Sequence, residues 1–201
     1  MSEPRWVPPT QPQLNAANKY IKLVLDTFAK RADATPESAI SATAIMAGTF
    51  LFRSFNFSLK QDVAPGTVVL SEQANICGEL LITTLCSGLN VLKVEIDQNK
   101  VDLYAKKYKQ QMTVNQAQEC LEKSMRAVSA KHNLTDEQAA HACALAAAAL
   151  IEESAAHLDV HLGFYAAVFG FISGTKTAPI PLSQDPVDKP ADSKKPWYKF
   201  W

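Results

Sequence analysis

Glycine is scarce in this sequence, with only seven among 201 residues. No glycine-rich stretch of the kind that cradles phosphate groups is present, so nothing in the sequence supports nucleotide chemistry. No serine lies in a G-x-S-x-G nucleophile elbow, and no hydroxyl residue neighbours a histidine along the chain. The absence of a recognisable catalytic motif favours a protein that is not an enzyme.

A net charge is also missing, because 20 lysines and arginines balance 20 aspartates and glutamates. Without an excess of one sign, the protein has no global field that would concentrate nucleic acid or an anionic membrane around it. The best apolar run, residues 162–174, is shorter than the roughly 20 residues of a membrane span. The first residues lack the apolar region of a secretory signal. We therefore expect a cytoplasmic protein that binds neither nucleic acid nor membrane.

The few cysteines are widely separated, and none forms a C-x-x-C pair. Each lies among apolar or helix-forming neighbours, which is typical of reduced thiols in a protein core. Because no cysteine motif for a metal or redox cofactor is present, we expect no cofactor. The four cysteines are Cys77, Cys86, Cys120 and Cys143.

What the sequence does contain is the apolar periodicity of helices, at steps of three and four residues. We expect helices over residues 14–31, 36–57, 71–89, 100–111 and 113–131. Thr135 and Gln138 then form a capping box before an alanine-rich run. That run either continues to Ser173 or breaks at residues 157–159, and we favour the break because ordinary helices seldom reach such a length. Asp159 would then cap a seventh helix.

The predicted fold class is all-α, a compact bundle of six or seven helices formed by residues 13–174. Two of the helices, 36–57 and 71–89, are apolar on most faces and are expected to be central. Residues 1–12 hold four prolines and are expected to be extended. Residues 175–201 are rich in proline and charge, so we expect a disordered tail.

Glu153, His157 and His161 follow one another at steps of four, so on a continuous helix they would share one face. Two histidines and a carboxylate on one stripe can bind zinc or iron. The order H-E-x-x-H of metalloproteases is absent. A metal- or small-molecule-binding bundle is therefore an alternative function, while the structural interpretation is a hydrogen bond between Glu153 and His157 on the helix surface.

Arg53 and Glu79 are isolated charges inside the two helices expected to be central. A buried charge needs a partner of opposite sign, so the simplest prediction is an ion pair between them. The other possibilities are that Arg53 extends to the surface past its phenylalanine neighbours, or that the two residues line a cleft for a small anion.

The most unusual feature is a cluster of aromatic residues after the proline-rich tail. Aromatic side chains are uncommon in disordered segments, and Trp and Tyr dominate the energetic centres of protein interfaces. The primary hypothesis is a non-enzymatic scaffold or adaptor that binds another protein partly through this peptide. Folding back onto its own domain, contact with a membrane interface and no role at all are the alternatives, and a homodimer remains open. The aromatic residues are Trp197, Tyr198, Phe200 and Trp201.

Overall fold

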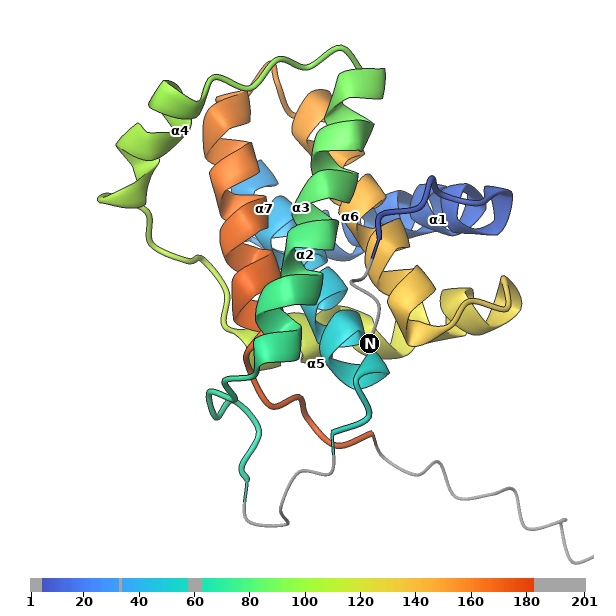
Figure 1. The fold of residues 1–201 in the computed structure, drawn as a ribbon. Coiled ribbons are helices and arrows are strands. Elements are labelled where there is room, and N and C mark those ends of the chain that lie inside the picture. Colours follow the sequence, from blue (N-terminus) through green and yellow to red (C-terminus); the bar gives the residue numbers. More distant parts are fainter. Residues whose placement is uncertain (1–4, 33, 58–62, 183–201) are drawn as a thin grey trace, which may run out of the picture.

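The computed structural model describes residues 5–32, 34–57 and 63–182 of the chain. These residues form seven α-helices, which confirms the predicted all-α bundle (Figure 1). Within this part of the chain the only β-pairing is a single antiparallel bridge between Val68 and Thr177. The helices are α1 (Gln11–Phe28), α2 (Pro36–Ser54), α3 (Glu72–Val91), α4 (Gln98–Ala105), α5 (Val114–Lys131), α6 (Asp136–Glu153) and α7 (Val160–Thr175).

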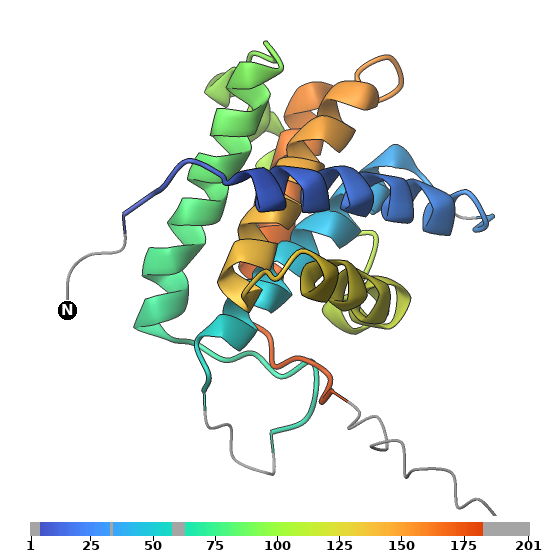
Figure 2. The same cartoon turned by 90° about the vertical axis from the view of Figure 1, so that its right-hand side faces the viewer.

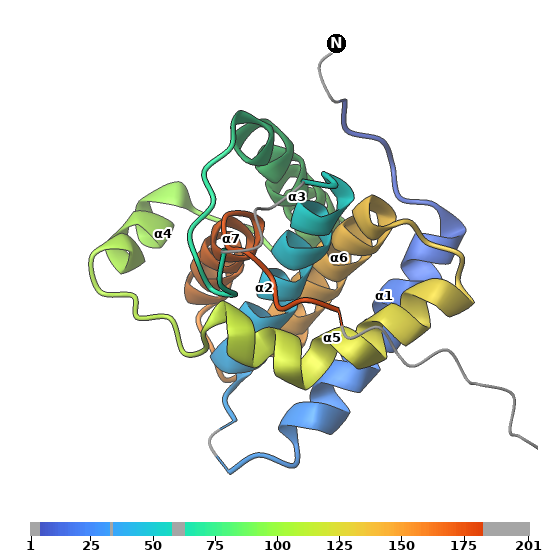
Figure 3. The same ribbon diagram turned by 90° about the horizontal axis from the view of Figure 1, so that it is seen from below.

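Helix α2 lies at the centre of the bundle, with α3, α5, α6 and α7 around it (Figure 3). Every residue from Ser38 to Phe52 is buried. The sequence explains this position, because the helix is apolar nearly all round and rich in alanine and serine, whose small side chains let neighbouring helices approach closely. The prediction that this helix is central is confirmed.

The second central helix is α6, not α3 as predicted. Helix α3 buries only one face, whereas α6 buries ten of its residues, seven of them alanines. Helix α1 lies across α6 on the outer side (Figure 2). The prediction was wrong because it ranked helices by hydropathy, while the small alanine side chains decide which helix can pack closely against α2 on one side and α1 on the other.

Helices α2 and α7 are in backbone contact through their glycines. A methyl group on Gly174 would collide with the carbonyl oxygen of Ile45, and one on Gly48 would lie 2.5 Å from the carbonyl oxygen of Phe171. Gly170, one turn before Gly174, meets the backbone of Ser41 in the same way. The absence of a side chain at these positions therefore sets the distance between the two helices.

The boundaries of α6 and α7 follow the capping signals. The Thr135 hydroxyl accepts a hydrogen bond from the Gln138 backbone N–H at 3.2 Å, and the Gln138 side chain accepts one from the Thr135 N–H at 3.0 Å. Helix α6 ends at Glu153, and Asp159 caps α7 by accepting a hydrogen bond from the His161 N–H at 2.8 Å. The predicted break between the two helices is confirmed.

The predicted boundaries of the terminal segments need two corrections. Helix α1 begins at Gln11, inside the segment expected to be extended, because Pro12 occupies its first turn, where a missing N–H costs nothing. At the other end, α7 extends to Thr175, and residues 176–182 continue as an ordered segment that we call the C-terminal strap. Ala178 of this strap is 1% exposed. The remainder of the predicted tail, residues 183–201, lies outside the described residues.

Candidate functional site

The three residues of the predicted metal site lie on different elements. Glu153 ends α6, the exposed His157 lies in the connecting turn, and His161 belongs to the first turn of α7. The Nδ1 atom of His161 lies 2.7 Å from the carboxylate of Asp159. The described residues contain no group of three or more His, Cys, Asp or Glu side chains that could hold a metal ion. The common helical face that the metal hypothesis requires is therefore absent.

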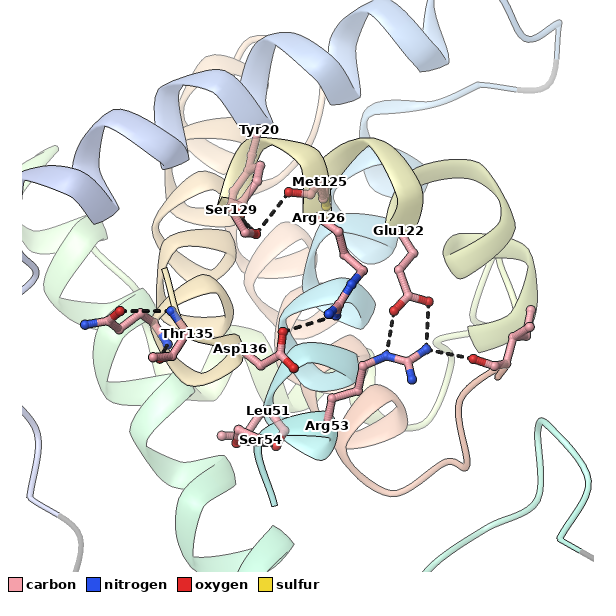
Figure 4. A network of polar contacts seen from close by, with 12 residues as sticks. Tyr20, Leu51, Arg53, Ser54, Glu122, Met125, Arg126, Ser129, Thr135 and Asp136 are labelled. Atoms are coloured by element: carbon pink, nitrogen blue, oxygen red, sulfur yellow. Dashed lines mark hydrogen bonds and ion pairs between the residues drawn. The ribbon is translucent and has the colours of Figure 1, made fainter. Parts of the chain in front are cut away.

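Arg53 forms an ion pair, but its partner is Glu122 of α5 and not Glu79 (Figure 4). Arg53 Nε donates to one carboxylate oxygen at 2.6 Å, and Nη2 donates to the other at 3.0 Å. The two side chains are 13% and 8% exposed, whereas Glu79 is exposed on α3. The predicted pair was wrong because the C-terminal end of α2 faces α5, and no sequence pattern indicated that topology.

Arg53 and Gln118 together hold the C-terminal strap. Arg53 Nη2 donates to the carbonyl oxygen of Ile180 at 2.7 Å, and the Gln118 side-chain oxygen accepts a hydrogen bond from the Ile180 N–H at 2.8 Å. The Gln118 amide also donates to the Thr49 hydroxyl at 3.1 Å. The sequence analysis did not identify Gln118 and Glu122, although their spacing of four on the mainly apolar buried stripe of α5 is a signal that could have identified them.

A chain of polar contacts connects the N-terminal segment to α3 and α6. Trp6 Nε1 donates to the Thr84 hydroxyl at 3.1 Å, and this hydroxyl lies 2.8 Å from His141 Nδ1. The Thr84 hydroxyl also donates to the carbonyl oxygen of Leu80 at 2.9 Å, as hydroxyls in packed helices usually do. Thr84 is 1% exposed, so its hydroxyl is not accessible to a substrate. The arrangement anchors the N-terminal segment and gives no nucleophile.

His141 should make the stability of the fold depend on pH. Burial lowers the pKa of His141 in the folded state, and nearby Glu137 offsets only part of that effect. Because the pKa of His141 in the folded state lies below its unfolded value of about 6.5, the unfolded chain binds a proton more readily than the folded one. The free energy of unfolding should therefore fall as the pH falls below about 6.5, while above that pH this histidine has no effect on it. Denaturant titrations at pH 7.5 and pH 5 measure how much the free energy of unfolding drops between the two pH values. The drop should be smaller for His141→Gln than for the wild type, and equal drops would contradict this prediction.

Helix α7 lies between α3 and α4 (Figure 1), and two of its aromatic rings, Tyr165 and Phe169, form a cluster with Tyr108. We call Tyr165, Phe169 and Ile172 the α7 face. Phe169 is 37% exposed and Ile172 is 48% exposed. Tyr108, from the connection between α4 and α5, packs against this face, with its ring 5.2 Å from the Tyr165 ring and 5.4 Å from the Phe169 ring.

A groove of about 230 Å³ lies beside the α7 face and is lined by residues of α7 and α3. Its lining includes Ile82, and Glu79 and Lys176 supply one charge of each sign. An apolar ridge beside a groove with charged edges is the arrangement found where proteins bind one another.

Helix α3 borders this region with a surface that holds both polar and apolar side chains. Among the described residues it is the one helix long and apolar enough to cross a membrane, and 28% of its most apolar window is buried. Its outward positions, however, include Glu72, Glu79 and Thr83, all of which are exposed. Ile76 and Val91 are exposed beside them, so the exposed side of α3 is mixed in character.

The four aromatic residues predicted to bind a partner, 197–198 and 200–201, lie outside the described residues, so that prediction remains a prediction. Comparison of the chain with protein-family models, with curated proteins and with solved structures finds no match.

Proposed function

We propose that this chain is a non-enzymatic helical scaffold that binds another protein through the α7 face and the aromatic C-terminal peptide of residues 196–201. The observation that carries the proposal is the exposure of Phe169 and Ile172 on a helix whose other side is packed in the core. When a partner covers large apolar side chains that were exposed to water, the free energy of binding becomes more favourable by about 25 cal/mol per Å² of apolar surface.

The rigidity of the α7 face supports this role. Ring contacts with Tyr108 restrict Tyr165 and Phe169 before any partner arrives, and the backbone of α7 is held against α2 by glycines. A surface that is already ordered loses little conformational entropy on binding, so more of the contact energy appears as affinity. The α7 face therefore suits a binding site better than a mobile loop of the same composition would.

The aromatic peptide gives the scaffold a second contact. The sequence places Trp197, Phe200 and Trp201 among three lysines, about 15 residues beyond the strap. Aromatic anchors that enter pockets can offset the entropy lost when such a linker is ordered, while the lysines mainly affect orientation and association rate. Two linked contacts also raise the apparent affinity through effective concentration.

The proposal is tested by affinity purification from cells that express the protein, comparing the intact chain with two variants. The first variant replaces Trp197, Phe200 and Trp201 by alanine, and the second is Phe169→Ser with Ile172→Ser. Each should lower partner recovery by about tenfold or more, because loss of an interface anchor typically costs 2 kcal/mol or more.

The matched control is Leu103→Ser, since Leu103 is 69% exposed on α4 and lies outside the α7 face. This variant should recover partners at the wild-type level. Equal recovery by the intact chain and both test variants would refute the proposal. If the triple-aromatic variant instead loses thermal stability but keeps its partners, the aromatic peptide folds back onto its own domain and does not bind a partner.

A further inference from the structure

Residues 66–70 form the outer edge of a short antiparallel pairing with the C-terminal strap. The Val69 N–H donates to the carbonyl oxygen of Lys176 at 2.7 Å, and the Ala178 N–H donates to the carbonyl oxygen of Thr67 at 2.8 Å. The Gly66 N–H donates to the Ala178 carbonyl oxygen at 2.9 Å. The segment is therefore held in place along its inner side.

No described residue pairs with the outer side of this segment. Within the described part of the chain, neither the Val68 N–H nor the Leu70 N–H has a hydrogen-bond partner. Because antiparallel pairing uses alternate residues for each neighbour, the backbone groups of Val68 and Leu70 face away from the strap. Val68 is 66% exposed and Leu70 is 79% exposed. An open, apolar strand edge of this kind is a template for another strand.

We propose that a second copy of this chain pairs with this edge, antiparallel and centred on Val69. This goes beyond the proposed function, which concerns a different polypeptide. In that register Val68 of one copy lies opposite Leu70 of the other, and the two residues exchange both N–H···O=C hydrogen bonds. The two-fold axis repeats this exchange between Leu70 of the first copy and Val68 of the second. The resulting four hydrogen bonds use every outward N–H and C=O group of residues 68 and 70 in both copies, as in an isologous dimer.

The charges around the edge favour a second copy as the partner. A two-fold axis brings identical segments together, and like charges directly opposite each other destabilise a strand pair. Residues 63–71 carry no charge at all, so this penalty does not arise. The border beyond the segment holds one charge of each sign, with the exposed Glu72 on α3 and Lys176 at the start of the strap.

The surface beside the edge would be covered in the same event. Val68 lines a hollow of about 530 Å³, and Ile76, in the second turn of α3, is 45% exposed. Two backbone strands alone form a marginal contact in water, whereas strands with an apolar face beside them can form a stable one. The strand pairing sets the geometry, and burial of these apolar side chains supplies the stabilisation.

The test uses sedimentation equilibrium on the purified full-length chain and two double variants, up to about 1 mM, the range needed for weak association. V68K/L70K places like charges opposite each other twice, so dimerisation should weaken by about tenfold or more. V68K/L70E places lysine opposite glutamate in the proposed register, so it should dimerise more tightly than V68K/L70K and lose that advantage in high salt. The control is Val91→Lys, at an exposed position at the other end of α3, which should behave as the wild type.

The expected result is a wild-type species at twice the 22.0 kDa mass of the chain, with the variants in the order described. A wild type that remains at 22.0 kDa throughout overturns the proposal. So does a V68K/L70K variant that associates like the wild type, and so does a V68K/L70E variant that associates no better than V68K/L70K. The variants change only exposed side chains, so their unfolding curves should match that of the wild type. Such a match excludes misfolding as the cause of weaker association.

Discussion

Replacing Gly174 by alanine is expected to lower the free energy of unfolding by about 3 kcal/mol or more, at the upper end of the cost of overpacking a core. The added methyl group would meet the carbonyl oxygen of Ile45 and lie 2.9 Å from the Thr49 nitrogen. Both are backbone atoms of α2, so no side chain can move aside and the helices must separate. Thermal unfolding should show a melting temperature about 6 to 12 °C lower, from the scaling for a chain of this size.

Gly78 supplies the matched control, because it is also a helical glycine and a methyl group there would meet nothing within 4 Å. Gly78→Ala should raise the free energy of unfolding by roughly 0.5 to 1 kcal/mol, since alanine reduces the entropy of the unfolded chain. The two substitutions are chemically identical and should have opposite signs. If Gly174→Ala proves neutral or stabilising, the described contact between α2 and α7 is wrong.

The second large effect is expected at Glu122. Glu122→Gln preserves the size of the side chain but removes its charge, which leaves the Arg53 guanidinium buried without a counter-ion. Removing one partner of a buried ion pair typically costs about 3 to 5 kcal/mol, and the lower end applies because Arg53 keeps its hydrogen bond to the Ile180 carbonyl oxygen. Denaturant unfolding followed by circular dichroism measures the difference directly.

Glu79→Gln is the control for this prediction, because Glu79 is the exposed acid of α3 that sequence reasoning chose as the partner of Arg53. Its substitution should change the free energy of unfolding by no more than about 0.5 kcal/mol. The double variant Arg53→Met with Glu122→Leu should regain most of the stability lost in Glu122→Gln, since no unpaired charge remains. A larger loss for Glu79→Gln than for Glu122→Gln would contradict the described pairing.

Local signals in the sequence predicted the presence of all seven helices, but the predicted helices 36–57 and 100–111 end earlier in the structure, at Ser54 and Ala105. The capping box at Thr135 and the cap at Asp159 set the ends of α6 and α7, because such bonds form between residues close in sequence. The central position of α2 was also predictable, since it has no polar face to present to water. These features depend on a residue and its neighbours within one or two helical turns.

The remaining features depend on which helices meet, and for that reason the sequence did not reveal them. The pair of Arg53 and Glu122 joins residues 69 positions apart. The ordered strap depends on partners supplied by α2, α5 and residues 66–69, while its own composition indicates disorder. The α7 face was hidden because α7 is apolar all round, and hydropathy does not show that Phe169 and Ile172 point outward.

The central claim, that the α7 face binds another protein, is tested most directly by photo-crosslinking in cells that express the chain. A photoreactive amino acid is placed at position 169 in one version of the protein and at the exposed position 103 of α4 in another. We predict a crosslinked product at position 169 that contains a different polypeptide and that is absent at position 103. No product at position 169, or the same products at both positions, would contradict the claim.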